Sequence, residues 1–344
     1  MKIFRILFKI LLFRFSIVYS AIHWLNIMLY KLRFRKIYKF SIPVVSIGNL
    51  TVGGTGKTPV TKKIAQYFLD QGFRPGIVSR GYKRLSKGTI RVCNGKTILS
   101  SIEECGDEPY LLAKMLGMKV PIVVSNNKAD AIHKIQEDYK VNVVLIDDGF
   151  QSFSIKRDID IVLINRSEPP ETYSMLPMGK MREPLSSLSR AHFIGLTKEG
   201  PVHSFIDSEI KKHDIKVFDT STCIYLSRET SGAKLKKISS KIDGSSIVAF
   251  CGLADPRSFE NSLSKLNLTI VKFIAFPDHH LYLDKDIEKL KKDMKDQSID
   301  FVVTSEKDYY KLPSKFIDQY NIHVLKYEVN IGHADLENIK KSIG

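Results

Sequence analysis

The chain has few cysteines, and their spacing does not match a metal site or a disulfide framework. The four lie far apart, with no C-x-x-C pair and no accompanying histidine spacing: they are Cys93, Cys105, Cys223 and Cys251. This scarcity argues against a zinc module and against a small disulfide-linked secreted domain. The four separated cysteines are best explained by a protein of the reducing cytoplasm. We also find no internal repeat.

Acidic residues are missing from the beginning of the chain, where the first is Asp70. Residues 1–40 combine nine Lys or Arg residues with many large apolar side chains, in a chain whose net charge is +16. On a helical wheel, polar side chains of this segment fall within a stripe of roughly 60°. The stripe consists of Lys2, Arg5, Lys9, Ser16, Ser20 and His23. This pattern predicts an amphipathic helix.

The N-terminal segment lacks the features of a cleaved signal peptide, because it has no small-residue cleavage site and Arg14 interrupts its apolar stretch. Its uncharged window, Phe15–Tyr30, has 16 residues, fewer than a spanning helix normally needs. We favour an interfacial helix followed by a basic cluster, Lys31–Lys36, that faces anionic headgroups. A spanning helix and a buried core helix stay open as alternatives. Because the cations interleave with aliphatic side chains, we expect no nucleic-acid partner.

Length and composition indicate a soluble globular enzyme with two domains, since the chain has 344 residues, 26% of them charged and 43% hydrophobic. From residue 41, short β-branched runs alternate with helical stretches, which is the pattern of a mostly parallel sheet. We predict strands at 43–47, 75–79, 121–125, 141–146, 159–164 and 193–196, with helices at 58–71, 109–116 and 128–137. A hairpin is expected within 84–101. After a polar stretch near 215–230, a second α/β pattern has strands at 247–250, 269–274 and 301–304 and helices at 256–266 and 285–294.

The most informative motif follows the first predicted strand. The sequence GNLTVGGTGKT, residues 48–58, approximates the phosphate-loop pattern G-x-x-x-x-G-K-[ST], in which backbone N–H groups face phosphates and the lysine reaches the outer ones. Thr51 stands where the first glycine of the pattern should be. The residues expected to bind ATP are Thr51, Val52, Gly53, Gly54, Thr55, Gly56, Lys57 and Thr58. The motif predicts a P-loop NTPase-like core.

Charged residues follow several of the other predicted strands, and ligands gather at the carboxyl ends of parallel strands. Asp147 and Asp148 end one strand, where a carboxylate commonly holds Mg²⁺ opposite the loop threonine, although an aspartate there is often only a turn residue. Arg80 follows the neighbouring strand and is placed to neutralise phosphoryl oxygens, unless it is a surface arginine.

Four further segments are candidates. Asp107 and Glu108 open a helix before a proline, which a helix cap explains as well as a catalytic base does. Residues 277–280, Pro-Asp-His-His, combine an acid and two imidazoles, and one histidine is expected to face the cleft. Arg182 lies in a loop rich in proline and glycine, and residues 304–308 end a later strand in mixed charge.

Taken in order, these pieces resemble the tetraacyldisaccharide 4'-kinase family, the lipid A kinases of Gram-negative bacteria. The resemblance rests on GNLTVGGTGKTP, SRGY, GDEP, DDGFQ, LPMGKMREP, DHH and SEKD. It implies two α/β/α lobes joined by a β-ribbon, here a membrane-associated helix (1–40), a kinase domain (41–220) and a smaller lobe (221–344). It also implies transfer of the γ-phosphate of ATP to the 4'-hydroxyl of an acylated glucosamine disaccharide 1-phosphate at the cytoplasmic face of the inner membrane. We expect a monomer.

The resemblance also implies roles for individual residues. Asp107 with a histidine of the DHH motif, preferably His279, would take the hydroxyl proton. The ATP and Mg²⁺ ligands would include Lys57, Thr58, Glu108, Asp147 and Asp148, and Arg80 and Arg182 would contact phosphates. Two positions depart from the family, because Ser152 replaces a common histidine and Lys128 is the nearest substitute for an arginine. A membrane-associated NTPase without an acceptor substrate is the rival interpretation.

Overall fold

The computed structural model describes residues 2–228, 236–238, 242–295 and 298–343. It divides into two compact units: unit 1 comprises residues 1–221 and 329–344, and unit 2 comprises residues 222–328. The C-terminal segment therefore belongs to unit 1, which differs from the sequence-based division that placed it in the smaller lobe. Two strands, β8 (Lys216–Arg228) and β13 (Ile322–Ile331), carry the chain between the units and are neighbours in the sheet order.

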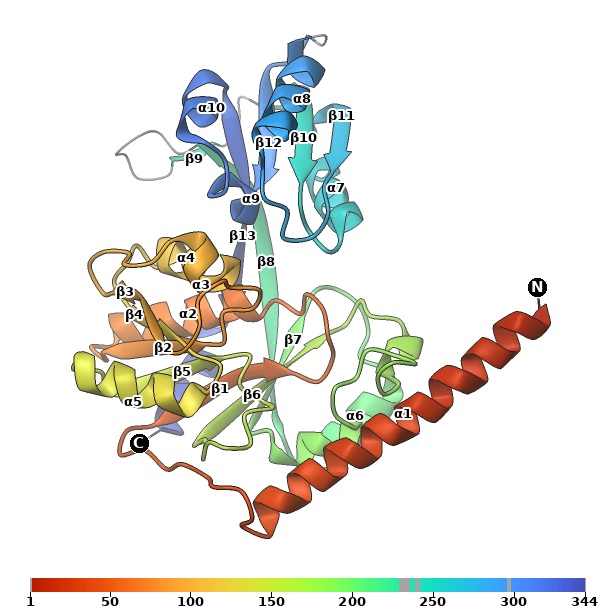
Figure 1. The fold of residues 1–344 in the computed structure, drawn as a ribbon, viewed down its shortest axis with the longest axis vertical. Helices are drawn as coiled ribbons and strands as arrows, with labels where there is room; N and C mark the ends of the chain where they lie inside the picture. The colour runs from red at the N-terminus through yellow and green to blue at the C-terminus, as the bar shows by residue number, and fades with distance from the viewer. Residues whose placement is uncertain (1, 229–235, 239–241, 296–297, 344) are drawn as a thin grey trace. The chain divides into compact units, whose positions relative to one another are not determined.

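Unit 1 contains a mostly parallel sheet with helices on both faces (Figure 1), as the sequence predicted. The order is β8-β7-β6-β1-β5-β2-β4-β3, and only β3 runs antiparallel to its neighbour. The strands besides β8 are β1 (Val44–Asn49), β2 (Pro75–Ser79), β3 (Ile90–Asn94), β4 (Pro121–Val124), β5 (Val143–Asp147), β6 (Ile159–Asn165) and β7 (Phe193–Thr197). The predicted hairpin at 84–101 reduces to β3 and a single bridge between Cys93 and Ile98.

Alternation along the strands of unit 1 divides their apolar side chains between two cores. On one face, Val45, Ile47 and Ile77 pack with α2 (Lys57–Asp70), α4 (Asp107–Met115) and α11 (His333–Lys341). On the other face, the alternate strand residues pack with α5 (Lys128–Asp138) and with α6 (Ser204–Lys212). The short helices are α3 (Ile102–Cys105), η1 (Pro170–Tyr173) and η2 (Leu185–Arg190). The central strands β1 and β5 are buried on both faces, so that only their ends are open to ligands.

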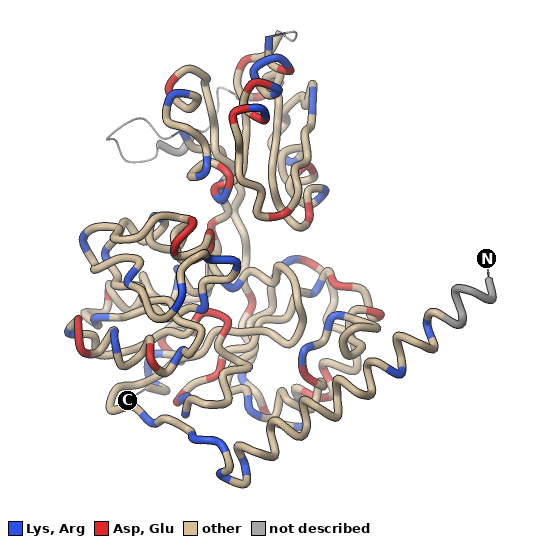
Figure 2. The backbone as a smooth tube through the Cα atoms, viewed as in Figure 1, with Lys and Arg blue, Asp and Glu red and all other residues tan. Residues whose placement is uncertain are grey.

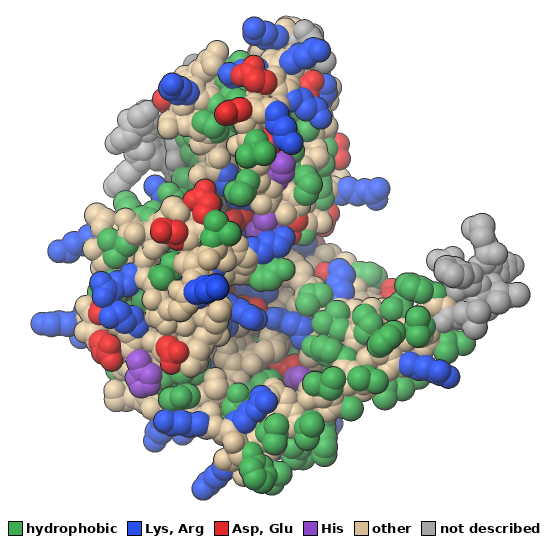
Figure 3. Space-filling view, viewed as in Figure 1, with side chains coloured by type: hydrophobic (Ala, Val, Ile, Leu, Met, Phe, Trp, Pro, Cys, Tyr) green, Lys and Arg blue, Asp and Glu red, His purple; other side chains and the backbone are tan. Residues whose placement is uncertain are grey.

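Helix α1 (Lys2–Lys31) leaves most of its apolar side chains exposed, as the hydrophobic side chains gathered along it in Figure 3 show. The segment Phe8–Lys31, 24 residues long, is long and apolar enough to cross a membrane. The polar stripe does not face solvent throughout: Ser16 is buried and His23 is half-buried against the rest of unit 1. Basic residues continue along the segment after the helix (Figure 2).

Unit 2 has its own parallel sheet in the order β11-β10-β12-β13. Its strands include β10 (Ser246–Cys251), β11 (Thr269–Ala275) and β12 (Phe301–Ser305), and β9 (Lys236–Ile238) pairs with β8. Helix α7 (Pro256–Ser264) covers one face, and the other face packs with α8 (Asp284–Lys295), α9 (Glu306–Tyr309) and α10 (Ser314–Gln319). Unit 2 is thus an α/β/α layer structure.

Candidate phosphate-binding site

The phosphate loop connects β1 to α2. Gly56 precedes the helix with φ 83°, a left-handed conformation that glycine adopts without strain, and makes no side-chain cap. The first N–H groups of α2 have no intrahelical partner, so they are available to an anion. Beneath the loop, the Asn49 side chain donates to Thr55 Oγ1 at 2.8 Å and accepts from Lys57 Nζ at 3.2 Å. The loop is therefore held in a concave shape by its own side chains.

Thr51, the departure from the phosphate-loop pattern, is buried and pairs with Met181 as an antiparallel bridge. Next to it, Leu50 O accepts from Arg182 N at 2.7 Å, and Val52 N donates to Lys180 O at 2.8 Å. The backbone at Thr51 does not adopt positive φ, so a glycine is not required there. Residues 180–182 support the first half of the loop instead.

Asp147 and Asp148, at the end of β5, have opposite electrostatic environments. Burial, with the nearby charges of Glu108 and Asp148, raises the pKa of Asp147 to about 7. Partial burial opposes ionisation of Asp148, whose side chain is 40% exposed, but hydrogen bonds from Arg182 at 2.8 and 2.9 Å and the Lys57 ammonium at 3.7 Å lower its pKa below the usual range. Asp148 is thus held as a carboxylate, whereas for Asp147 burial and the neighbouring acids outweigh the charges of Lys57 and Lys128.

Lys128 completes the cationic side of the site. Its ammonium donates to Asp147 O at 3.2 Å and to Asp148 O. Burial lowers its pKa to about 8, and the charges of Arg182 and Arg80 act in the same direction. Arg80 therefore lies within electrostatic range of this group, as its position after β2 predicted. The sequence offered Lys128 only as a substitute for a family arginine, and the structure places it within the site.

The GDEP and SRGY motifs pack against each other backbone to backbone. A Cβ on Gly106 would lie 2.9 Å from Tyr82 O, and one on Gly81 would lie 2.6 Å from Cys105 O. This contact explains both glycines and fixes the start of α4 near the end of β2. Asp107 is the first residue of α4 and the N-cap is Gly106, without a side-chain cap. The Asp107 side chain therefore does not act as the N-cap of α4.

In unit 2, the two histidines of the DHH motif have different surroundings. His280 Nε2 lies 3.0 Å from Asp286 Oδ2, and its ring stacks on Phe276 with centroids 4.7 Å apart. His279 has φ 64° and lies 3.6 Å from Asp278 Oδ2. His280 therefore has a structural role, which favours His279 as the reactive imidazole. Asp107 and His279 belong to different units, so their pairing stays a prediction.

The SEKD segment supports the DHH turn. Asp308 is completely buried and accepts from Gly252 N at 2.9 Å and from Ser305 Oγ at 2.6 Å. Gly252 O in turn accepts from His279 N at 3.3 Å. Asp308, one of the charged residues after β12, therefore supports the turn that carries His279.

The acids of unit 1 fit some requirements of a Mg²⁺ site and not others. Within the described residues, no three His, Cys, Asp or Glu side chains lie close enough to hold a metal by themselves. Mg²⁺ commonly binds through one or two carboxylates, water and substrate phosphates. The raised pKa of Asp147, caused by burial and by Glu108 and Asp148, fits such a cation. The Thr61 hydroxyl donates to Asp147 Oδ1 at 3.3 Å, and Thr58, the predicted Mg²⁺ ligand of the loop, is the second residue of α2.

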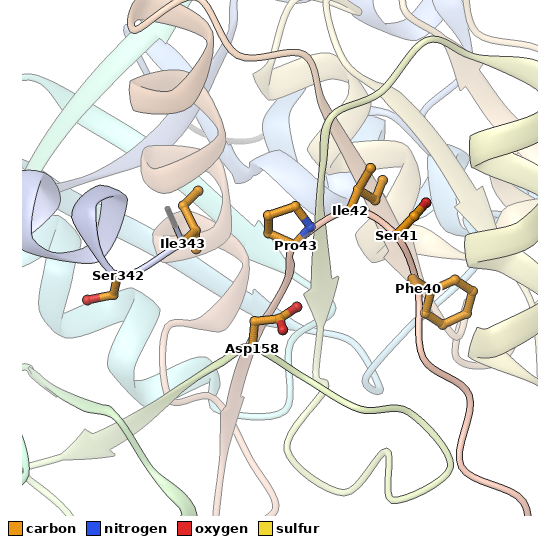
Figure 4. Close-up of a pocket in the computed structure, with 7 residues that line it drawn as sticks. All are labelled: Phe40, Ser41, Ile42, Pro43, Asp158, Ser342 and Ile343. Carbon is orange, nitrogen blue, oxygen red and sulfur yellow. The ribbon is translucent and has the colours of Figure 1, made fainter.

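A separate cavity of about 470 Å³ opens at the amino ends of β1 and β6 (Figure 4). Its lining includes Phe40, Pro43 and Asp158, and Asp158 Oδ2 accepts from Val44 N at 2.8 Å. Because ligands of parallel α/β sheets bind at the carboxyl ends, we assign no role in phosphate binding to this cavity.

Several site residues escaped the sequence reasoning. Asn49 and Gln151 lie next to recognised motifs but are uncharged, and Glu183 follows the predicted Arg182. The Glu183 carboxylate accepts from Gln151 Nε2 at 2.7 Å and from Arg190 Nη2 at 2.7 Å. The only sequence signal for these residues was their position inside or beside GNLTVGGTGKTP, DDGFQ and LPMGKMREP.

Comparisons with known proteins show which family the chain is similar to. The family model described as tetraacyldisaccharide-1-P 4'-kinase matches residues 8–343. A tetraacyldisaccharide 4'-kinase of Halothermothrix orenii is 33% identical over 96% of this chain and 92% of its own length. One of Pelobacter propionicus is 36% identical over 88% of this chain and 82% of its own. The crystal structure of LpxK from Aquifex aeolicus in complex with ATP has 29% identity and a TM-score of 0.77, covering 98% of this chain and 100% of that one.

Proposed function

The chain belongs to the tetraacyldisaccharide-1-P 4'-kinase family, and on that premise we propose that it phosphorylates the 4'-hydroxyl of a tetraacyl glucosamine disaccharide 1-phosphate in lipid A biosynthesis. ATP is the phosphate donor, and the product is the bis-phosphorylated precursor lipid IVA. The observation that carries the proposal is the convergence of Lys57 and Arg182 on Asp148 beside the phosphate loop.

The reaction requires the acceptor oxygen to form a bond to the γ-phosphorus while the bond to the β–γ bridging oxygen breaks and ADP leaves. The protein contributes mainly positioning and charge stabilisation. The loop N–H groups and Lys57 bind the phosphates, and Arg80 and Arg182 stabilise the negative charge on the transferring group. Asp107 is assigned to take the proton of the acceptor hydroxyl, and His279 is the imidazole predicted to assist it.

Magnesium is the second cofactor of the proposal. Thr58, Glu108, Asp147 and Asp148 would hold it together with the ATP phosphates, and bound Mg²⁺ would neutralise phosphate charge. The raised pKa of Asp147 supports this assignment, because a divalent cation would favour its ionised form.

The acceptor lipid places the enzyme at the cytoplasmic face of the inner membrane, either as a peripheral protein or with a single N-terminal anchor. Support comes from the exposed apolar side chains of α1, including Phe13, Ile22 and Trp24, and from the basic cluster at Lys31–Lys36. Apolar burial and attraction to anionic headgroups act together in such segments.

The test is mass spectrometry of the lipid after incubation of the purified protein with ATP, Mg²⁺ and the tetraacyl disaccharide 1-phosphate. We expect a gain of one phosphoryl group, located on the distal sugar by fragmentation, and ATP turnover that requires the acceptor. ATP hydrolysis without acceptor and without lipid product would instead identify a membrane-associated regulatory or motor NTPase.

A further inference from the structure

The side of α1 that faces unit 1 is polar and makes specific contacts. The Ser16 hydroxyl lies 3.0 Å from Met175 O and 3.2 Å from Met178 N, and Ser16 is 7% exposed. One turn further along, Tyr19 Oη donates to Arg182 O at 3.1 Å. A helix that served only as a membrane anchor would not need hydrogen bonds to one loop of the kinase core.

Glu183 is the buried group at the centre of these contacts. Its side chain is 0% exposed, and His23 Nε2 of α1 lies 3.6 Å from Glu183 Oε2. Gln151 and Arg190 donate to the same carboxylate. A buried carboxylate is stable only when it is paired and hydrogen-bonded. Burial opposes ionisation here, but His23 and Arg190 lower the pKa of Glu183 below its usual value.

The other side of this cluster is the phosphate loop. Gln151 Nε2 also donates to Asn49 O at 3.1 Å, and Arg182 Nη2 donates to the same oxygen at 3.1 Å. Asn49 accepts from Lys57 through its side chain. A continuous set of hydrogen bonds therefore runs from Glu183 through Gln151 to the residues that hold the phosphate loop, and His23 Nε2 packs 3.6 Å from the Glu183 carboxylate at its other end.

We propose that α1 is a structural part of the phosphate site. Through Tyr19, His23 and Glu183 it positions Arg182 and the first half of the phosphate loop, independently of its exposed apolar face. This inference rests on the proposed kinase function. His23 and Glu183 are positioning residues, because they act through Arg182 and Asn49 and not on the substrate.

The first test separates the two faces of α1 with point variants, because deleting the helix would remove both. The turnover of detergent-solubilised acceptor and the binding to vesicles of phosphatidylethanolamine and phosphatidylglycerol are measured for each variant. We expect His23→Ala to lower kcat about tenfold at saturating substrates with unchanged vesicle binding. Trp24→Ala, on the exposed face, is the reference for weakened vesicle binding.

The second test concerns the carboxylate. We expect Glu183→Gln to lower kcat by roughly 10- to 100-fold, because the amide has no negative charge and only one acceptor oxygen, so it cannot accept from both Gln151 and Arg190. The matched control is Glu168→Gln, which removes the ion pair of Glu168 with Lys180 at 3.1 Å on the same loop but touches neither Arg182 nor Asn49; its kcat should be unchanged. If Glu183→Gln fails to fold, Tyr19→Phe, which removes one hydroxyl, takes its place.

The decisive readout is the combination with Arg182→Ala. If Glu183 acts by positioning Arg182, Glu183→Gln should reduce kcat little further in the Arg182→Ala background. A merely structural contact would give additive losses. Wild-type kcat for folded His23→Ala and Glu183→Gln, or additive losses in the double variant, overturns the proposal. A wild-type protein that makes no phosphorylated lipid would instead contradict the kinase function itself.

Discussion

The carboxyl ends of the two sheets are built from different kinds of interaction. In unit 1, the acids after β5 lie among cations: Arg182 and Lys57 contact the Asp148 carboxylate, and Lys128 contacts backbone oxygens. In unit 2, the acid after β12, Asp308, is completely buried and accepts hydrogen bonds from the neutral donors Gly252 N and Ser305 Oγ.

This difference separates two uses of a carboxylate. Asp148 is 40% exposed at its side chain, so a ligand can exchange with its partners. Asp308 is enclosed, and its contacts fix the backbone of the turn that carries His279. We therefore expect the charged, accessible groups of unit 1 to bind phosphate and the buried acid of unit 2 to orient another residue. The predictions below test each half of this comparison.

The largest effect is expected from Lys57→Ala, which removes a cation from the accessible cluster. Its loss should lower kcat by roughly 10³-fold, because a charge that stabilises phosphoryl oxygens in the transition state is missing. The measurement is lipid phosphorylation at saturating ATP, with Tm as the folding control. Lys63→Ala on the same helix is the matched variant and should be active. Near-normal kinase activity of Lys57→Ala would show that this loop does not bind the transferred phosphate.

Asp107→Asn tests the acid at the start of α4. If Asp107 accepts the proton of the acceptor hydroxyl, the amide should cost at least about 10²-fold in kcat, while the KM for ATP changes little. His279→Ala should reduce kcat in the same direction, and the double variant should be far less than additive if the two act as one unit. If Asp107→Asn kept the wild-type kcat, Asp107 would have only an electrostatic role at the N-terminus of α4.

The phosphate loop was predictable because its residues are contiguous and each has a known physical role. The positions of most strands along the chain were also predictable from their β-branched segments, and most predicted strand ends lie within one or two residues of the observed ones. Strand β8 was missed because seven of its 13 residues are exposed and polar residues interrupt its apolar ones, so its composition resembles a linker. The membership of the C-terminal segment in unit 1 depends on tertiary packing of Leu336 and Ile339.

The supporting groups of the site could not be predicted for a different reason. His23, Gln151 and Glu183 meet from segments far apart in the chain, and no local pattern joins them. The opposite pKa shifts of Asp147 and Asp148 were equally invisible, because two adjacent aspartates look alike in sequence. Burial and the position of Arg182 distinguish them, and both depend on the complete fold.

Gly252→Ala tests the buried half of the comparison with a smaller perturbation. A Cβ there would lie 3.0 Å from Asp308 Oδ1 and 3.1 Å from Pro277 O, so the turn that carries His279 must shift. We expect kcat to fall about tenfold, with an unchanged KM for ATP because the ATP ligands are in unit 1. Leu263→Ala, which opens a cavity in the other core of unit 2, controls for lost stability. Equal kcat losses in both variants would mean that Asp308 and Gly252 do not orient His279.

The smallest effect is on stability, and it has opposite signs at the two neighbouring acids of unit 1. The pKa of Asp147 is raised to about 7, so its contribution to stability is fully present below the unfolded value near 3.8 and is lost as the pH rises through 7. Asp147→Asn should therefore raise Tm at pH 8, and the gain should disappear toward pH 4.

The pKa of Asp148 is lowered, so its contribution to stability is present above pH 3.8. Asp148→Asn should therefore lower Tm at pH 8, and this loss of Tm should shrink in acid. Calorimetry of the three proteins between pH 2 and 8 measures both, at about 2–4 °C per kcal/mol for a domain of this size. Adding Mg²⁺ and ATP should stabilise the wild type more than Asp147→Asn, because a ligand that binds the ionised carboxylate shifts the folding equilibrium by mass action. If both variants moved Tm in the same direction at pH 8, the two acids would not differ in the way that the positions of Arg182 and Lys57 require.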